Sequence, residues 1–453
     1  MKIHPNAFAL EEFLVSLSRE HLEVVVHLTR CGTCRRRFQS LLSGCSGPIG
    51  KKLAEVLQWC PRSADYEPAL RETEQLIQHR GHGLVKERSK APGLFVELIA
   101  LPPERRELLL QNSTRFHTWG LFELLVERCL ETSIQSPQYA EDLGFLALRL
   151  SAHLDEDHYG EELIEDLRAR AWGYIGNSRR VRSDLRGAEE AISKAYSHLC
   201  KGTKDLFERA VLLDLEASLR RDQRQFENAS KLLRRAIDIF LQSDQRHRAG
   251  RSLVKLSTVY HYAGDPEGGI PLLHQAIGLI DSEQEPRLLI CAHHNLIDYL
   301  AASGRYLEAQ RHYREARPLY RSFTDAWTQN RRKWVKGKIS YGLGQFEQAE
   351  ALFLATRQGF VEEGIPFDTA LVSVDLAMLY ARQGRTVELK RLAEEMVSIF
   401  SALHIHREAL AALAFLKQAA EAEHATVDLV SRVACYLRKA QYDPELRFQE
   451  MVS

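Results

Sequence analysis

The hydrophobic residues of this chain recur with a helical period over most of its length. Apolar side chains fall three and four positions apart, as in Leu253, Leu256 and Tyr260, and short polar turns separate the runs. Spacing of this kind places the apolar side chains on one face of an α-helix. The sequence therefore predicts an all-α protein built from consecutive amphipathic helices.

Four glycines divide these helices at a constant step. Gly264, Gly304, Gly344 and Gly384 are evenly spaced, and each closes one apolar pattern just before the next one opens. Glycine most readily takes the left-handed backbone that ends a helix. A constant step of about 40 residues predicts an α-solenoid, in which every repeat is a helix pair that contacts its neighbours.

The second helix of each repeat has a pattern of its own. A small residue is followed four positions later by a bulky apolar residue, and usually by a small residue three positions beyond. The small residues let a neighbouring backbone approach, and the bulky residue fills the groove between the helices. The copies are Ala229, Leu233, Ala236; Gly269, Leu273, Ala276; Ala309, Tyr313, Ala316; Ala349, Phe353, Thr356; and Leu389, Ala393, Met396.

This pattern resembles the tetratricopeptide repeat (TPR) from about Gly160 to the C-terminus. The resemblance implies a right-handed α-solenoid of TPR-like helix pairs, although the usual period of that repeat is about 34 residues. The longer step implies longer helices or turns, as in the arrays of some bacterial peptide-sensing and signalling regulators. The Trp and the Leu-Gly pair of the TPR first helix are mostly absent, and Gly337 is the one glycine at that phase.

Changes of pattern divide the chain into four parts. We expect a small helical module over residues 1–60, a helical connecting region or degenerate repeats over 61–155, the TPR-like array over 156–406 and capping helices over 407–453. His424 stands where the glycine step would continue, as expected of a terminal repeat.

Composition narrows the partners that such an array can have. Lys plus Arg and Asp plus Glu both total 61, so no global field attracts nucleic acid or an anionic membrane. The longest apolar stretches, such as 93–101, are too short to span a bilayer. Eight scattered cysteines and the lack of a signal-peptide pattern favour a reduced, cytoplasmic setting.

A candidate metal site precedes the array. The segment HLTRCGTC places His27, Cys31 and Cys34 at spacings of four and three, so that on a helix all three side chains share one face. Imidazole and thiolate are ligands that Zn²⁺ accepts in tetrahedral geometry, and a structural site needs a fourth. His4 is the first choice for that ligand and Cys45 the second.

This segment resembles the zinc-binding anti-sigma-factor domain at His4, His27, Cys31, Cys34 and the following residues 35–38. The resemblance implies a structural Zn²⁺ and a sigma factor as partner. The alternatives are that the cysteines are small buried residues and that His27 lies on the surface. Residues 35–37, all arginine, could mark a nucleic-acid patch, but they equally complement a helix dipole, and we expect no nucleic-acid partner.

We find no enzyme signature in the chain: no phosphate-binding glycine loop, no metalloprotease helix and no nucleophile elbow. First helices line the concave side of TPR-like arrays, which makes their polar residues candidates for partner binding. These candidates are Arg251, His261, His294, Asp298, Arg331, Trp334, Lys338 and Tyr341. An exposed Trp334 would anchor a peptide or protein, whereas burial between helices is the alternative.

Two functions fit these features. The first is a bacterial regulator, in which a structural zinc module is joined to an array that binds a protein or peptide. The second is a scaffold that assembles other proteins, with the zinc module only structural. Both are non-enzymatic, and neither specifies an oligomeric state.

Overall fold

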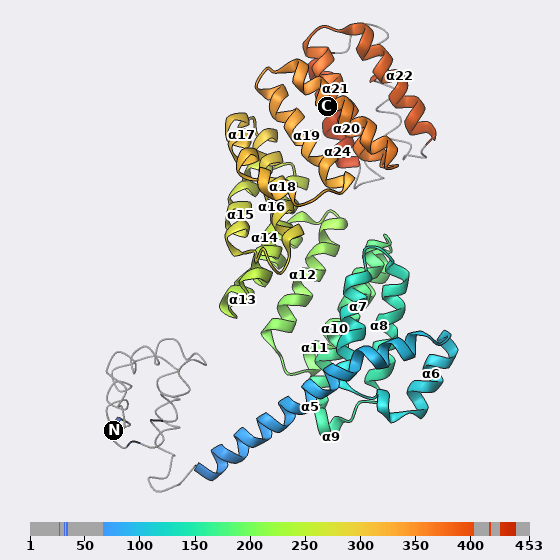
Figure 1. The fold of residues 1–453 in the computed structure, drawn as a ribbon, viewed down its shortest axis with the longest axis vertical. Helices are drawn as coiled ribbons and strands as arrows, with labels where there is room; N and C mark the ends of the chain where they lie inside the picture. Colours follow the sequence, from blue (N-terminus) through green and yellow to red (C-terminus); the bar gives the residue numbers. More distant parts are fainter. Residues whose placement is uncertain are drawn as a thin grey trace. The chain divides into compact units, whose positions relative to one another are not determined.

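The computed structural model describes residues 67–402 and 426–440, together with His27, Cys31, Thr33, Cys34, Leu416 and Lys417. All the elements within these residues are helices, and no strand occurs among them. Contacts divide the chain into two units, Met1–Lys90 and Ala91–Ser453. Figure 1 labels the helices along the chain. The all-α, helix-pair architecture expected from the sequence is confirmed.

Within the described part of the chain, several elements precede the array. They are α5 (Glu67–Ile99), α6 (Pro103–Asn112), the 3-10 helix η2 (Thr114–Phe116), α7 (Trp119–Thr132), α8 (Pro137–Ser151) and α9 (Glu156–Tyr159). None of the described helices, here or in the array, combines the length and apolar character needed to cross a bilayer.

The first helices of the repeats begin at an almost unbroken step that equals the glycine spacing. After α10 (Glu161–Val181) come α12 (Leu206–Asp222), α14 (Arg246–Tyr262), α16 (Pro286–Ala302), α19 (Ala326–Gly342) and α21 (Pro366–Arg382). From α12 onward each has 17 residues. The period in the sequence is therefore the period of the fold.

The second helices keep the same step. They are α11 (Leu185–Lys201), α13 (Phe226–Gln242), α15 (Pro266–Leu279), the broken pair α17 (Tyr306–Glu315) and α18 (Arg317–Arg321), α20 (Phe346–Glu362) and α22 (Thr386–Ala402). Each packs against its first helix, as α14 does against α15 and α19 against α20. The final described helix, α24 (Val427–Ala440), packs against α21.

The turns explain the glycine pattern and extend it. Gly264, Gly304, Gly344 and Gly384 all have positive φ, between 65° and 90°, which confirms the predicted left-handed turns. Arg224, one period before Gly264, takes the same conformation with φ of 60°. A second set of left-handed turns, between repeats, recurs at multiples of this period: Lys204, Asp244 and Gly364. Because two of these three are not glycines, the sequence did not reveal them.

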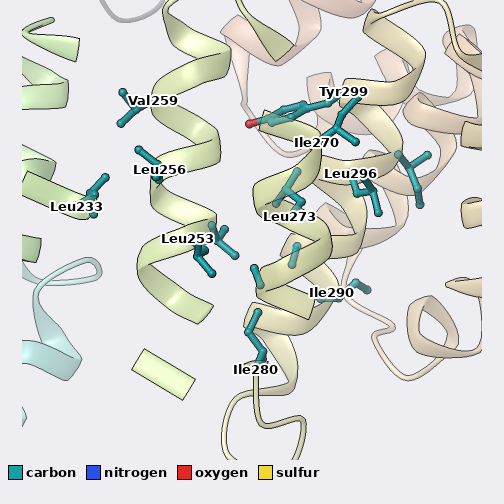
Figure 2. Packing of buried hydrophobic residues seen from close by; sticks show 14 of the residues in the cluster. Leu233, Leu253, Leu256, Val259, Ile270, Leu273, Ile280, Ile290, Leu296 and Tyr299 are labelled. Carbon is teal, nitrogen blue, oxygen red and sulfur yellow. The ribbon is translucent and has the colours of Figure 1, made fainter. Parts of the chain in front are cut away.

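The small and bulky positions of the second helices form the core. Ala229, Leu233, Leu273 and Ala276 are at most 1% exposed, as the pattern predicted. Figure 2 shows Leu273 of α15 among apolar side chains of the adjoining helices. The neighbouring helices lie close together because the small residues leave room for the backbone.

The two helices that precede the array, α7 and α8, share a core with its first helix, α10. Helices α7 and α8 pack against each other and against α10. One apolar core, from Leu98 to Leu219, runs through all three. The pair α7–α8 thus packs on the first repeat.

Candidate binding pocket and candidate metal site

First helices α14, α16, α19 and α21 together line a pocket of about 410 Å³. Helix α24 forms another part of its wall through Ser431, Ala434 and Cys435. The repeat step brings side chains of one phase together here, because residues 298, 338 and 378 stand one period apart and all line the pocket. The pocket is therefore a product of regular stacking.

Seven of the eight predicted partner-binding residues line this pocket: His261, His294, Asp298, Arg331, Trp334, Lys338 and Tyr341. The eighth, Arg251, is not among the lining residues. Its guanidinium instead forms an ion pair with Glu285. Sequence reasoning thus selected residues that the fold gathers in one place, with Arg251 as the exception.

Trp334 lines the pocket, but most of its side chain is buried. Trp334 is 5% exposed and belongs to the core, so its ring is buried between helices, as the alternative interpretation expected. The indole N–H donates to Asp375 Oδ2 at 2.7 Å. The Lys338 ammonium lies 4.5 Å from the ring centre and the Arg331 guanidinium 5.4 Å from it. Trp334 therefore holds the charged groups in place.

Two ion pairs between first helices place charged groups of both signs at the pocket. Lys338 Nζ donates to Asp298 Oδ1 at 2.7 Å, and one Arg331 nitrogen donates to both Asp368 oxygens at 3.0 and 2.9 Å. Burial would raise the pKa of Asp298, but the nearby Lys338 and histidine charges outweigh it and lower that pKa. For Asp368 burial outweighs the Arg331 charge, and the pKa is raised. Charges of both signs thus face one pocket.

His294 is held by an unusual second helix. Its Nδ1 lies 2.8 Å from the hydroxyl of Tyr320, a residue of the short helix α18 that is 1% exposed. Tyr320 has the same repeat phase as Phe240, Ile280 and Phe360, which are all buried, so the regular repeat places it in the core beside this histidine. Burial, opposed by Asp298, lowers the pKa of His294 to about 4.

We expect His294 to make the array less stable in acid. The folded pKa is about 4, below the value of about 6.5 for an unfolded histidine, so the unfolded chain binds an extra proton between these values. Stability contributed by the neutral ring is present above about pH 6.5 and is lost as the pH falls toward about 4. Thermal melting across this range should show a shallower acid loss in His294→Gln. An identical pH profile for both proteins would contradict this assignment.

Charged pairs between successive first helices continue beyond the pocket. Arg170 pairs with Glu208, Lys255 with Asp214 and Arg287 with Asp325. The partners in these pairs are 38 or 41 residues apart. These pairs did not enter the sequence prediction. The signal that could have found them is opposite charge about one period apart.

The residues of the candidate metal site are close together. One ligand atom from each of His27, Cys31 and Cys34 lies within 4.8 Å of the others. The Cys31 amide donates to the His27 carbonyl at 2.8 Å, one helical turn, as the spacing predicted. Cys34 is 5% exposed. This donor set fits Zn²⁺, while His4 and Cys45 lie outside the described residues.

Sequence comparison does not assign the chain to a known group: no family model and no curated protein matches it. Solved structures do match. The crystal structure of a Rap protein complexed with competence and sporulation factor has a TM-score of 0.51 and 12% identity, and the match covers 73% of this chain and 94% of that one. Aspartyl phosphate phosphatase F from Bacillus subtilis gives a TM-score of 0.46 at 11% identity, covering 89% and 96%.

The first of these likenesses supports the fold. Rap proteins are TPR-like helical repeat proteins, so the match agrees with the helix pairs observed here. At 12% identity the likeness concerns architecture alone, and function rests on the chemistry of the pocket.

Proposed function

We propose that this protein is a regulator whose TPR-like array binds a peptide or a peptide-like segment of a protein in the pocket of α14, α16, α19 and α21. The observation that carries the proposal is the convergence of Asp298, Lys338, Arg331 and Trp334 on one cavity of about 410 Å³. Pockets of this size, with apolar walls and a few placed polar groups, are typical of ligand sites.

The chemistry of the pocket favours a peptide over a purely apolar molecule. The pocket has two ion pairs, Lys338–Asp298 and Arg331–Asp368. Their charged groups can exchange these partners for the charged groups of a peptide. Leu371 and Met378 supply apolar contact beside them. The Rap protein with TM-score 0.51 was crystallised with a bound factor, which supports this use of the fold.

The proposal can be tested by selecting, from a library of short random-sequence peptides, those that bind the full chain. We expect enriched peptides to bind the native protein about tenfold or more tightly than Lys338→Glu or Asp298→Lys, because each change places like charges together in the pocket. The double variant, which restores an opposite pair, should select different peptides. Arg128→Glu, in an exposed pair on α7, is the matched control.

Peptides that bind the native chain and the pocket variants equally would overturn the proposal. A scaffold that uses other surfaces would give this outcome. Circular dichroism of each variant distinguishes loss of binding from loss of fold.

We also propose that His27, Cys31 and Cys34 bind one structural Zn²⁺ with a fourth ligand from His4 or Cys45. The support is the closeness of the three described donors and their match to zinc chemistry. The partner of this module, if the resemblance to anti-sigma domains extends to function, is a sigma factor.

Metal analysis of the purified full chain tests the zinc proposal. We expect about one Zn²⁺ per chain, lost in Cys31→Ser/Cys34→Ser, because both thiolates are ligands. Cys200→Ser/Cys435→Ser, which removes two exposed thiols elsewhere, should keep its zinc. A native chain without zinc, or a Cys31→Ser/Cys34→Ser chain that retains it, would contradict the assignment.

A further inference from the structure

The last described helix, α24, has the phase of a second helix but an additional packing partner. Its Leu429, Val433 and Tyr436 continue the small-and-bulky stripe of α22 at the repeat step, and all three are buried. Earlier second helices pack on the first helices directly before and after them in the chain, as α13 does on α12 and α14. Helix α24 packs on α21, the first helix of the pair before its own. It therefore reaches the side of the array on which first helices line the pocket.

One position identifies the face of α24 that is turned toward this side. Ala434 is 1% exposed. At the same phase, the second helices from α13 to α22 carry exposed residues: Arg234, His274, Arg314, Leu354 and Glu394. Ser431 and Cys435 share this face of α24, since they stand three positions before Ala434 and one after it, and all three line the pocket. The face that other second helices turn to solvent is thus a wall of the pocket in α24.

The side chains on this wall are small and uncharged. They stand at phases that hold charged residues in other second helices: Arg311, Arg314 and Glu315 in α17, and Arg391, Glu394 and Glu395 in α22. Leu371 and Met378 of α21 line the same pocket and add apolar surface. A charged group placed against such a wall would lose its hydration without gaining a partner. This part of the pocket therefore suits an uncharged group, unlike the part formed by the ion pairs.

We propose that α24 is a ligand-contacting wall of the pocket, and that Ser431, Ala434 and Cys435 select an uncharged side chain of the bound peptide. This inference rests on the proposed peptide-binding function and adds the residues that determine one part of its specificity. The ion pairs of α16, α19 and α21 contact charged groups of the peptide, and α24 contacts the neighbouring uncharged side chain. The C-terminal helix thus contributes to recognition as well as covering the end of the array.

Peptide selection on Cys435 variants of the full chain tests this inference, because Cys435 is exposed and leaves room for a larger side chain. We expect peptides enriched on Cys435→Glu to carry Lys or Arg at one position, and those enriched on Cys435→Arg to carry Asp or Glu there. The native chain should enrich uncharged residues at that position. Cys200→Glu and Cys200→Arg, at an exposed cysteine of α11 outside the pocket lining, are the matched controls and should enrich the native motif.

Thiol labelling of the native chain provides a second measurement that needs no substitution. At a peptide concentration of about ten times Kd, the free site falls about tenfold, so the reaction of Cys435 with iodoacetamide should slow by about the same factor. Cys200 should react at an unchanged rate. Mass spectrometry follows the two thiols separately in one sample.

Native motifs on both Cys435 variants would overturn the inference, as would labelling of Cys435 at the same rate with and without peptide. If the selected peptides still bind the native chain more tightly than Lys338→Glu, the proposed function stands and only the role of α24 fails. A native chain that enriches no peptide would overturn both. Circular dichroism shows whether each variant is folded.

Discussion

Replacement of Trp334 by alanine should lower the free energy of unfolding by about 3–5 kcal/mol, the cost of truncating a large buried aromatic side chain. Trp334 is 5% exposed and packs at 5.8 Å, edge to face, on the ring of Phe360. The change also removes the indole donor to Asp375 and the ring beneath Lys338. Urea unfolding followed by circular dichroism measures the loss.

Trp327 provides the control for this prediction. It lies on the same helix, but 43% of it is exposed, and the Arg331 guanidinium lies 5.2 Å from its ring centre. Trp327→Ala should cost about 1 kcal/mol or less. Equal losses for the two variants would show that Trp334 does not hold the pocket wall together.

Replacement of Gly337 by valine should destabilise the array by about 1–3 kcal/mol, because the inserted carbon atoms overpack a closed interface. A Cβ at position 337 would lie 2.6 and 2.8 Å from two ring carbons of Phe353. Phe353 is 1% exposed, so its ring is enclosed by neighbouring side chains. Urea unfolding again gives the measurement.

Gly278→Val is the matched substitution. Gly278 is also helical, in α15, but a Cβ there would meet no atom within 4 Å. Valine should therefore be neutral or slightly stabilising, since it favours a helix more than glycine does. Similar destabilisation at both positions would mean that overpacking against Phe353 is not the cause.

The repeat could be predicted from the sequence because its period is marked by positions that accept few residue types. Gly264, Gly304, Gly344 and Gly384 occupy left-handed turns, and positions such as Ala229 and Leu233 occupy closely packed faces. The intervening turns escaped notice because Lys204 and Asp244 adopt the same backbone without being glycine. No residue pattern marks such positions.

The pocket was predictable in part. Phase along the first helices selected His261, Asp298 and Lys338 as groove residues, and all three line the pocket, because stacked repeats bring equal phases together. Phase did not reveal Asp375, which accepts from the buried indole, or Tyr320, which reaches His294 through a broken second helix. The His294–Tyr320 contact lies one period before the Trp334–Phe360 contact, so the repeat sets its position, while the hydrogen bond depends on which residue types occupy that position.

Hydrogen exchange of the full chain with a selected peptide tests the central proposal most directly. If the peptide binds in the pocket, amide exchange should slow in α16, α19 and α21, which provide most of its lining, and stay unchanged in α11 and α13, which provide none of it. Slowing confined to the second helices, or none in α16, α19 and α21 at saturating peptide, would contradict the proposal.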